Sequence, residues 1–200
     1  MKHILNSTLA LLVAASTAFA APQVGQPAPE FTLTDSNGKS HNLSDFKGKF
    51  VVLEWLNHGC PFVRKHYDGG NMQSLQKEYT GKDVVWLSIA SSAPGKQGHM
   101  SPEEANKTKE EKGSAATAIL IDEDGTVGKL YDAKVTPELY VIDPEGTLIY
   151  MGAIDDKKSV ETADVAGAKN YVKQALDEAM AGKPLSEPAT TAYGCGVKYN

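Results

Sequence analysis

The chemistry of this chain is most readily sought at its two cysteines, Cys60 and Cys195, the only residues of their type among 200. Cys60 follows an apolar run at residues 50–53 that predicts a buried strand, and it precedes Pro61. Proline suits the first position of a helix because the N–H that it lacks has no intrahelical partner there. Cys60 would then be the N-cap residue. The unpaired N–H groups and the helix dipole at that position favour an anion, so we expect a lowered thiol pKa and a nucleophilic thiolate.

The residues around Cys60 are rich in potential positive charge. Arg64 lies four residues further on, where the helical repeat would bring its guanidinium to the same face as the sulfur. His58, Lys65 and His66 could add to this charge. The alternative is a buried, unreactive cysteine, since cysteine is among the most buried residue types. We favour the reactive cysteine because strand ends that lead into helix N-termini are edges of α/β sheets at which ligands bind.

The composition and the N-terminal segment limit the classes of function. Residues 1–20 combine a basic start, an apolar centre and the small-x-small pattern Ala18-Phe19-Ala20, which predicts a secretory signal peptide and an exported, periplasmic or secreted protein. The apolar centre is too short for a membrane span, so no membrane insertion is expected. Without the leader, 19 basic residues face 25 acidic ones, a net charge of about −6 that argues against a nucleic-acid partner. An oxidising compartment would allow Cys60 and Cys195 to pair.

The hydrophobic pattern predicts one α/β domain at residues 21–184 and a tail at residues 185–200 that carries Cys195. Asn37-Gly38 between alternating residues indicates an N-terminal β-hairpin. Two apolar strands separated by a helix predict a parallel βαβ unit. The predicted elements that follow the hairpin are strands at 50–55, 84–89, 119–121, 139–142 and 148–151, and helices at 61–68, 71–79, 101–113, 127–131 and 160–181.

The order of these elements and several motifs resemble the redoxins, thioredoxin-like proteins of the alkyl hydroperoxide reductase and thiol-specific antioxidant type. The resemblance covers residues 24–184 and implies a thioredoxin-like fold, a central mixed β-sheet flanked by helices, here with an N-terminal β-hairpin extension. A peroxiredoxin-like subgroup of exported bacterial proteins is closer still, and residues 54–63 and 193–199 match its two motifs. The segments that carry the resemblance are Gly25-x-x-Ala28-Pro29-x-Phe31, Gly48-Lys49-x-Val51-Val52-Leu53, Glu54-Trp55-x-Asn57-x-x-Cys60-Pro61-Phe62-Val63, Val135-Thr136-Pro137 and Tyr193-Gly194-Cys195-x-Val197-Lys198-Tyr199.

The resemblance also implies roles for individual residues. Thr136 and Pro137 match the substrate-binding cis-proline segment of thioredoxins. Leu53 and Asn57 stand where peroxiredoxins have Pro and Thr, and Asn57 could donate a hydrogen bond to a peroxide oxygen. Arg64 could replace the later peroxiredoxin arginine, for which Thr136-Pro137 stands here. Thioredoxins have a second cysteine where this chain has Val63, so dithiol exchange within that motif is excluded.

Four functions follow from these residues. The first is a thiol peroxidase, in which Cys60 attacks a hydroperoxide, Cys195 resolves the sulfenic acid within one chain or across a homodimer, and an unidentified thiol donates electrons. The alternative is thiol-disulfide exchange with a protein disulfide substrate. The others are a non-enzymatic metal-binding module using His58, Cys60, His66 and Cys195, and a permanent structural disulfide. The preferred prediction, the peroxidase, implies no cofactor and no metal.

Overall fold

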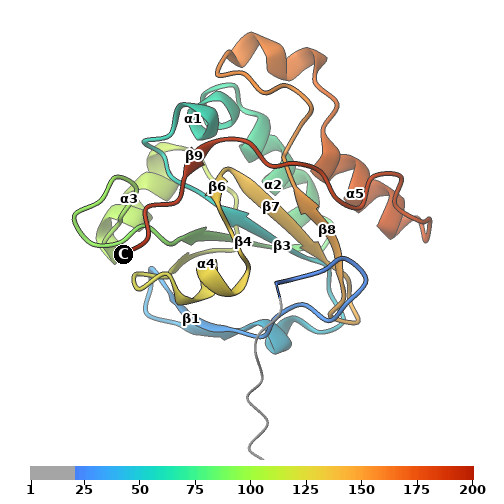
Figure 1. Cartoon of the computed structure of the whole chain (residues 1–200), viewed down its shortest axis with the longest axis horizontal. Coiled ribbons are helices and arrows are strands. Elements are labelled where there is room, and N and C mark those ends of the chain that lie inside the picture. The colour runs from blue at the N-terminus through green and yellow to red at the C-terminus, as the bar shows by residue number, and fades with distance from the viewer. Residues whose placement is uncertain (1–20) are drawn as a thin grey trace, which may run out of the picture.

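A seven-stranded mixed sheet forms the centre of the molecule, with helices on both of its faces (Figure 1). The computed structural model describes residues 21–200, and the predicted signal peptide at residues 1–20 lies outside them. The strand order is β2-β1-β5-β4-β3-β7-β8, so the predicted central mixed sheet is confirmed. The strands of this sheet are β1 (Thr32–Asp35), β2 (Ser40–Asn42), β3 (Val51–Trp55), β4 (Val85–Ala90), β5 (Ala118–Ile121), β7 (Glu138–Ile142) and β8 (Leu148–Gly152).

Local sequence signals explain one edge of the sheet and its centre. The predicted hairpin around Asn37-Gly38 is confirmed as β1 and β2, and β1 extends the sheet by pairing with β5. Strand β3 is buried along its whole length, as its apolar sequence predicts, and runs parallel to β4. The helices between these two strands complete the predicted βαβ unit. Cys60 therefore lies just beyond the end of a central strand.

The helices lie where the sequence predicts them, with one exception. Helix α3 begins with a capping box at Ser101, whose hydroxyl accepts the backbone N–H of Glu104 at 3.2 Å. The described helices are α1 (Pro61–Asp68), α2 (Asn71–Thr80), α3 (Pro102–Glu111), α4 (Thr126–Leu130) and α5 (Tyr171–Met180), with 3₁₀ helices at Leu43–Phe46 and Thr162–Gly167. Within residues 21–200, no helix combines the length and the apolar character that crossing a bilayer requires.

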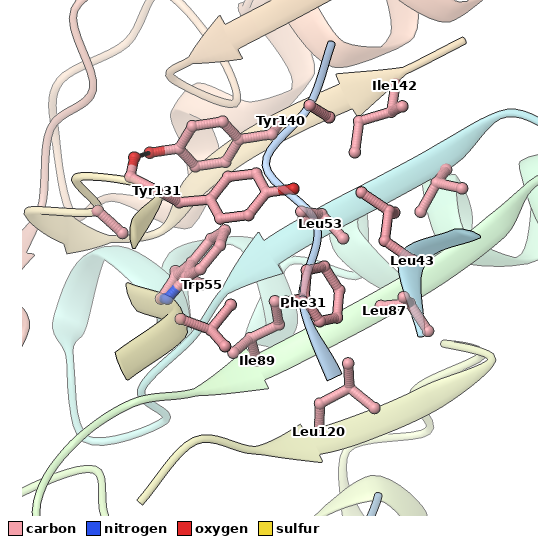
Figure 2. Packing of buried hydrophobic residues seen from close by; sticks show 14 of the residues in the cluster. Phe31, Leu43, Leu53, Trp55, Leu87, Ile89, Leu120, Tyr131, Tyr140 and Ile142 are labelled. Carbon is pink, nitrogen blue, oxygen red and sulfur yellow. Dashed lines mark hydrogen bonds between the residues drawn. The ribbon is translucent and has the colours of Figure 1, made fainter. Parts of the chain in front are cut away.

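Each face of the sheet has its own hydrophobic core. On one face α1, α2 and α5 pack through residues such as Val63, Leu75 and Leu176. On the other face Phe31 and α4 cover the alternate residues of the strands. Figure 2 shows this second core, in which the rings of Trp55, Tyr131 and Tyr140 meet at centroid distances of 5.1–5.4 Å. Successive residues of a strand point to opposite faces of the sheet, and both faces carry a core, so the central strands are apolar on both sides.

The predicted continuous helix at residues 160–181 is wrong. The structure has the short 3₁₀ helix Thr162–Gly167, then extended backbone at Ala168, and only then α5. Asn170 caps the new helix, because its side chain accepts the backbone N–H of Lys173 at 2.8 Å. The Asn170 side chain thus takes the Lys173 N–H that a continuous helix would direct to the carbonyl of Lys169, so a new helix begins here although the apolar spacing continues across the break.

The C-terminal tail crosses the molecule instead of leaving it. In Figure 1 it runs from α5, between α1 and β6, toward α4. Its strand β9 (Cys195–Gly196) pairs antiparallel with β6 (Val135–Thr136) in a separate two-stranded sheet that the sequence did not predict. Tyr199 anchors the far end by donating a hydrogen bond to the carbonyl of Ala133 at 2.7 Å. The tail is thereby held over the N-terminus of α1.

Candidate active site

Cys60 is the N-cap residue of α1, as the sequence predicts, and Pro61 is the first helical residue. A tight turn leads into the helix, since the Cys60 N–H donates to the carbonyl of Asn57 at 2.9 Å. The Cys60 side chain is 0% exposed and contacts the core formed by α1, α2 and α5. The thiol donates a hydrogen bond to the carbonyl of Thr136 at 3.2 Å. The cysteine thus lies between its own helix and β6.

The tail brings Cys195 to this place. Cys195 is paired in register with Thr136, the residue whose carbonyl accepts the Cys60 thiol. Both cysteines are free thiols, Cys60 buried and Cys195 partly exposed. The peptide bond between Thr136 and Pro137 is cis, in agreement with the resemblance. Cys60, Cys195, Thr136 and Pro137, which are far apart in the sequence, therefore form one cluster.

The two thiols differ in acidity. Burial by itself raises the pKa of Cys60, but hydrogen bonds from the Cys195 thiol and from the N–H groups of Val63, Cys195 and Phe62 favour the thiolate, and the net pKa is lowered. Burial raises the pKa of Cys195 to about 11, and its hydrogen bond to Cys60 and the repulsion of that sulfur's charge add to the effect. Cys60 is thus the more acidic thiol of the pair, and Cys195 is the less acidic one.

The positive charges are not distributed around Cys60 as the sequence analysis expected. Arg64 is exposed, and it acts on the other sulfur, where with Lys198 it partly offsets the raised pKa of Cys195. Burial lowers the pKa values of His58 and His66 to about 4, so both rings are neutral near pH 7. Lys65 is buried and paired with a carboxylate. Hydrogen bonds from Cys195 and the start of α1, not neighbouring cations, therefore stabilise the thiolate.

Asn57 shapes the loop before Cys60. Its side-chain oxygen accepts the Gly59 N–H at 2.8 Å, and its amide nitrogen donates to the carbonyl of Gln97 at 3.3 Å. The side chain also lies against Gly98, where a Cβ would come within 2.6 Å of its nitrogen. The expected hydrogen bond from Asn57 to a peroxide is not favoured by this geometry, because the amide is engaged in joining two loops.

The proposed metal ligands do not converge. The His58 ring lies edge-on to Tyr67 at 4.6 Å between centroids, whereas His66 Nδ1 faces the amide of Asn71 at 2.9 Å. In the part of the chain that the structure describes, no three His, Cys, Asp or Glu side chains are grouped as a metal site. The geometry of residues 21–200 therefore gives the metal-binding alternative no support.

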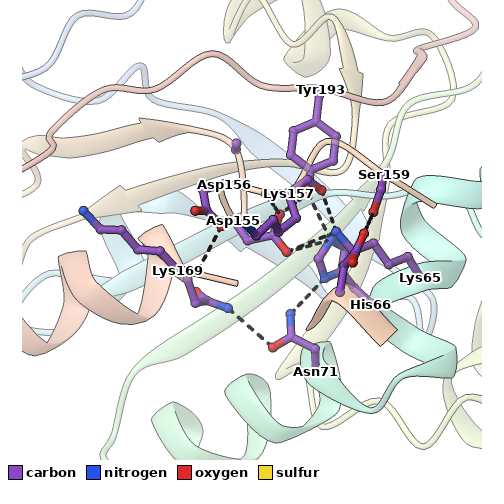
Figure 3. Close-up of polar contacts among 12 residues, drawn as sticks. Lys65, His66, Asn71, Asp155, Asp156, Lys157, Ser159, Lys169 and Tyr193 are labelled. Atoms are coloured by element: carbon purple, nitrogen blue, oxygen red, sulfur yellow. Dashed lines mark hydrogen bonds and ion pairs between the residues drawn. The ribbon is translucent and has the colours of Figure 1, made fainter. Parts of the chain in front are cut away.

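Two buried polar clusters near the cysteines were missed by the sequence analysis. Glu54, on β3, is 0% exposed and accepts hydrogen bonds from Tyr67, Gln76, Trp86 and Ser88 at 2.8–3.0 Å. A charged residue inside an otherwise apolar strand was the signal that could have identified it. The second cluster joins Lys65, Asp155 and Tyr193 (Figure 3), and no local pattern links these three residues.

Comparison with known proteins places the chain among thiol-based redox proteins. The model of the AhpC/TSA family matches residues 24–151. The thiol-disulfide oxidoreductase ResA of Bacillus subtilis is 28% identical over 125 residues, which are 62% of this chain and 64% of ResA, just under two thirds of its length.

Solved structures agree with the fold. A crystal structure of an uncharacterized conserved protein from Geobacillus kaustophilus is 29% identical and covers 89% of this chain and 93% of its own, with a TM-score of 0.76. The thioredoxin domain of a thiol-disulfide oxidoreductase from Bacteroides vulgatus is 21% identical, covers 74% of this chain and 97% of its own, and has a TM-score of 0.52. The predicted thioredoxin-like fold is confirmed. Since the family model matches more than half of the residues, the chain belongs to the AhpC/TSA family.

Proposed function

We propose that this protein is a thiol-disulfide oxidoreductase in which Cys60 is the nucleophile and Cys195 completes the redox pair. The observation that carries the proposal is the pairing of β9 with β6, which holds a protonated Cys195 against a Cys60 of lowered pKa. The similarity to ResA supports exchange with disulfides. This was the alternative in the sequence analysis, and we now prefer it to the peroxidase.

The reaction follows from the two acidities. The Cys60 thiolate attacks one sulfur of a protein disulfide, a mixed disulfide forms, and the other substrate sulfur leaves as a thiolate. Cys195 then loses its proton and attacks the Cys60 sulfur, which releases the second substrate thiolate and leaves a Cys60–Cys195 disulfide. The substrate gains two electrons and this protein loses them. A dithiol donor then reduces the Cys60–Cys195 disulfide and restores the two thiols.

Access to Cys60 requires movement of the tail. The Cys60 side chain is 0% exposed, and β9 covers the β6 segment that contains Thr136. A polypeptide substrate would pair with this edge by strand addition once β9 has moved away. Thr136 and Pro137 would then contact the substrate, in keeping with their predicted role. Residues 1–20 support export, so we place the reaction in the periplasm or outside the cell.

The test is reduction of the insulin disulfides by the reduced mature protein, with dithiothreitol as donor. We expect catalysis by the wild type and none by Cys60→Ser. Reduced Cys195→Ser that is mixed with insulin after removal of dithiothreitol should stop at a mixed disulfide, since that variant cannot resolve the intermediate. Insulin reduction by Cys60→Ser at the wild-type rate would refute the role of Cys60. A Cys60–Cys195 disulfide that persists in excess dithiothreitol would indicate a structural bond instead.

A thiol peroxidase remains the second candidate, because the burial of Cys60 admits a small oxidant more easily than a protein. The thiolate would displace alcohol or water from a hydroperoxide to form a sulfenic acid, which Cys195 would condense with to give the disulfide and water. Oxidation of the reduced protein by hydrogen peroxide, followed by stopped flow, separates the candidates. A rate equal to that of free cysteine would exclude the peroxidase, and a much higher rate that depends on Cys60 would favour it.

A further inference from the structure

A single buried carboxylate connects the elements that carry the two cysteines. Asp155 follows β8 and is 2% exposed. Its Oδ2 accepts Lys65 Nζ at 3.3 Å, and its Oδ1 accepts the Tyr193 hydroxyl and the Lys157 N–H (Figure 3). Lys65 is on α1 and Tyr193 is in the C-terminal tail, whereas Lys157 follows Asp155 in the same loop. Asp155 is therefore a junction and not part of a simple surface ion pair.

The two side chains that meet at Asp155 lie close in sequence to the two cysteines. Lys65 is on α1, five residues after Cys60, and its side chain is 0% exposed. Tyr193 lies two residues before Cys195 and is 6% exposed. The rigid helix carries Cys60 at one end of the connection, and the tail carries Cys195 at the other.

The contacts hold both side chains in one place. Lys65 Nζ also donates to the carbonyl of Lys157 at 2.6 Å, so the ammonium group cannot turn toward solvent without losing both bonds. The Tyr193 ring packs edge-on against Phe62 of α1 at 5.7 Å between centroids. Burial and the neighbouring carboxylate raise the pKa of Tyr193, so its hydroxyl keeps the proton that it donates to Asp155. The tail is thus fixed to α1 by packing and by the shared carboxylate.

We propose that Tyr193 is a positioning residue that, through Asp155 and Lys65, holds Cys195 at Cys60. A buried ion pair adds little net stability because both groups lose their hydration, whereas it can select one arrangement of the chain. Here the arrangement is the register of β9 on β6. The inference rests on the proposed function only in taking Cys60 and Cys195 as the redox pair, and it concerns how strongly they pair, not the substrate.

The variant Tyr193→Phe tests this, because it keeps the ring against Phe62 and removes only the hydroxyl. A hydrogen bond to a charged group is worth about 1.5–3 kcal/mol, which corresponds to roughly a tenfold effect or more. We expect about a tenfold fall in the equilibrium constant for forming the Cys60–Cys195 disulfide in glutathione buffers. We also expect a higher pKa for Cys60 in the reduced protein, measured by thiolate absorbance, since Cys195 donates to it less often.

Tyr79→Phe is the matched control. Tyr79 is also buried, and its hydroxyl also donates to a carboxylate, Asp177, at 2.8 Å, but this bond joins α2 to α5. The control should lower the free energy of unfolding while leaving both the glutathione equilibrium and the pKa of Cys60 unchanged.

Two results would overturn the proposal. In one, Tyr193→Phe leaves both readouts at their wild-type values. In the other, Tyr79→Phe changes them as much as Tyr193→Phe does, which would show that general destabilisation is responsible. Neither readout involves a protein substrate, so failure of insulin reduction would leave this test intact and would count only against the proposed function.

Discussion

A methyl group at position 194 should displace Cys195 from Cys60. Gly194 precedes Cys195, and a Cβ built there would lie 2.6 Å from the carbonyl carbon of Thr136 and closer still to its oxygen. Non-bonded carbons prefer separations of about 3.5 Å or more. In Gly194→Ala, β9 must therefore move away from β6 by about 1 Å.

The effect of that displacement can be estimated. A misplacement of about 1 Å between reacting groups can cost on the order of 100-fold. We therefore expect the effective concentration of Cys195 at Cys60 to fall about 100-fold. Because a tenfold change in a two-electron equilibrium corresponds to about 30 mV, the reduction potential should become less negative by about 60 mV. The pKa of Cys60 should rise as well, since the thiol and N–H of Cys195 stabilise the thiolate.

The assay is equilibration with glutathione buffers, followed by alkylation of free thiols and mass spectrometry. Gly196→Ala is the control on the other side of Cys195, because a Cβ there would find its nearest atom, the carbonyl oxygen of Lys134, at an ordinary 3.8 Å. A Gly194→Ala potential equal to that of the wild type, or equal shifts in both variants, would refute the steric reasoning.

Two further predictions concern pH. Alkylation of Cys60 should follow a pH profile with its midpoint below that of an ordinary cysteine, while Cys195 should react only near its pKa of about 11; a shared midpoint in the two peptides, measured by mass spectrometry, would contradict the assigned acidities. Glu54 has a raised pKa because it is buried, so its contribution to stability is complete below the unfolded value of about 4.3 and is lost as the pH rises through the folded value. In Glu54→Gln, the free energy of unfolding measured with urea should depend less on pH between pH 4 and pH 8 than it does in the wild type. The same pH dependence in both proteins would count against this role of Glu54.

The elements that the sequence predicted correctly are those specified by neighbouring residues. Pro61 after Cys60 marks the start of α1, Asn37-Gly38 marks the turn between β1 and β2, and the apolar run of β3 needs no distant partner to be recognised. Turn chemistry, helix capping and hydrophobic pattern act over a few residues, so one sequence suffices to read them. The position of Cys60 at a helix N-terminus belongs to this class.

The tertiary structure decided the environment of Cys60. The register between Cys195 and Thr136 joins segments 59 residues apart, and no local pattern encodes a two-residue strand. The sequence indicated Lys65 as a source of positive charge near the sulfur, but Lys65 is buried and paired with Asp155, 90 residues away, which supplies its counter-charge. Burial and partners depend on the whole packed chain, and they set the pKa values. The sequence alone therefore predicted Cys60 as the nucleophile and indicated the family, whereas only the fold showed how Cys195 is held next to Cys60 and which of the two thiols is the more acidic.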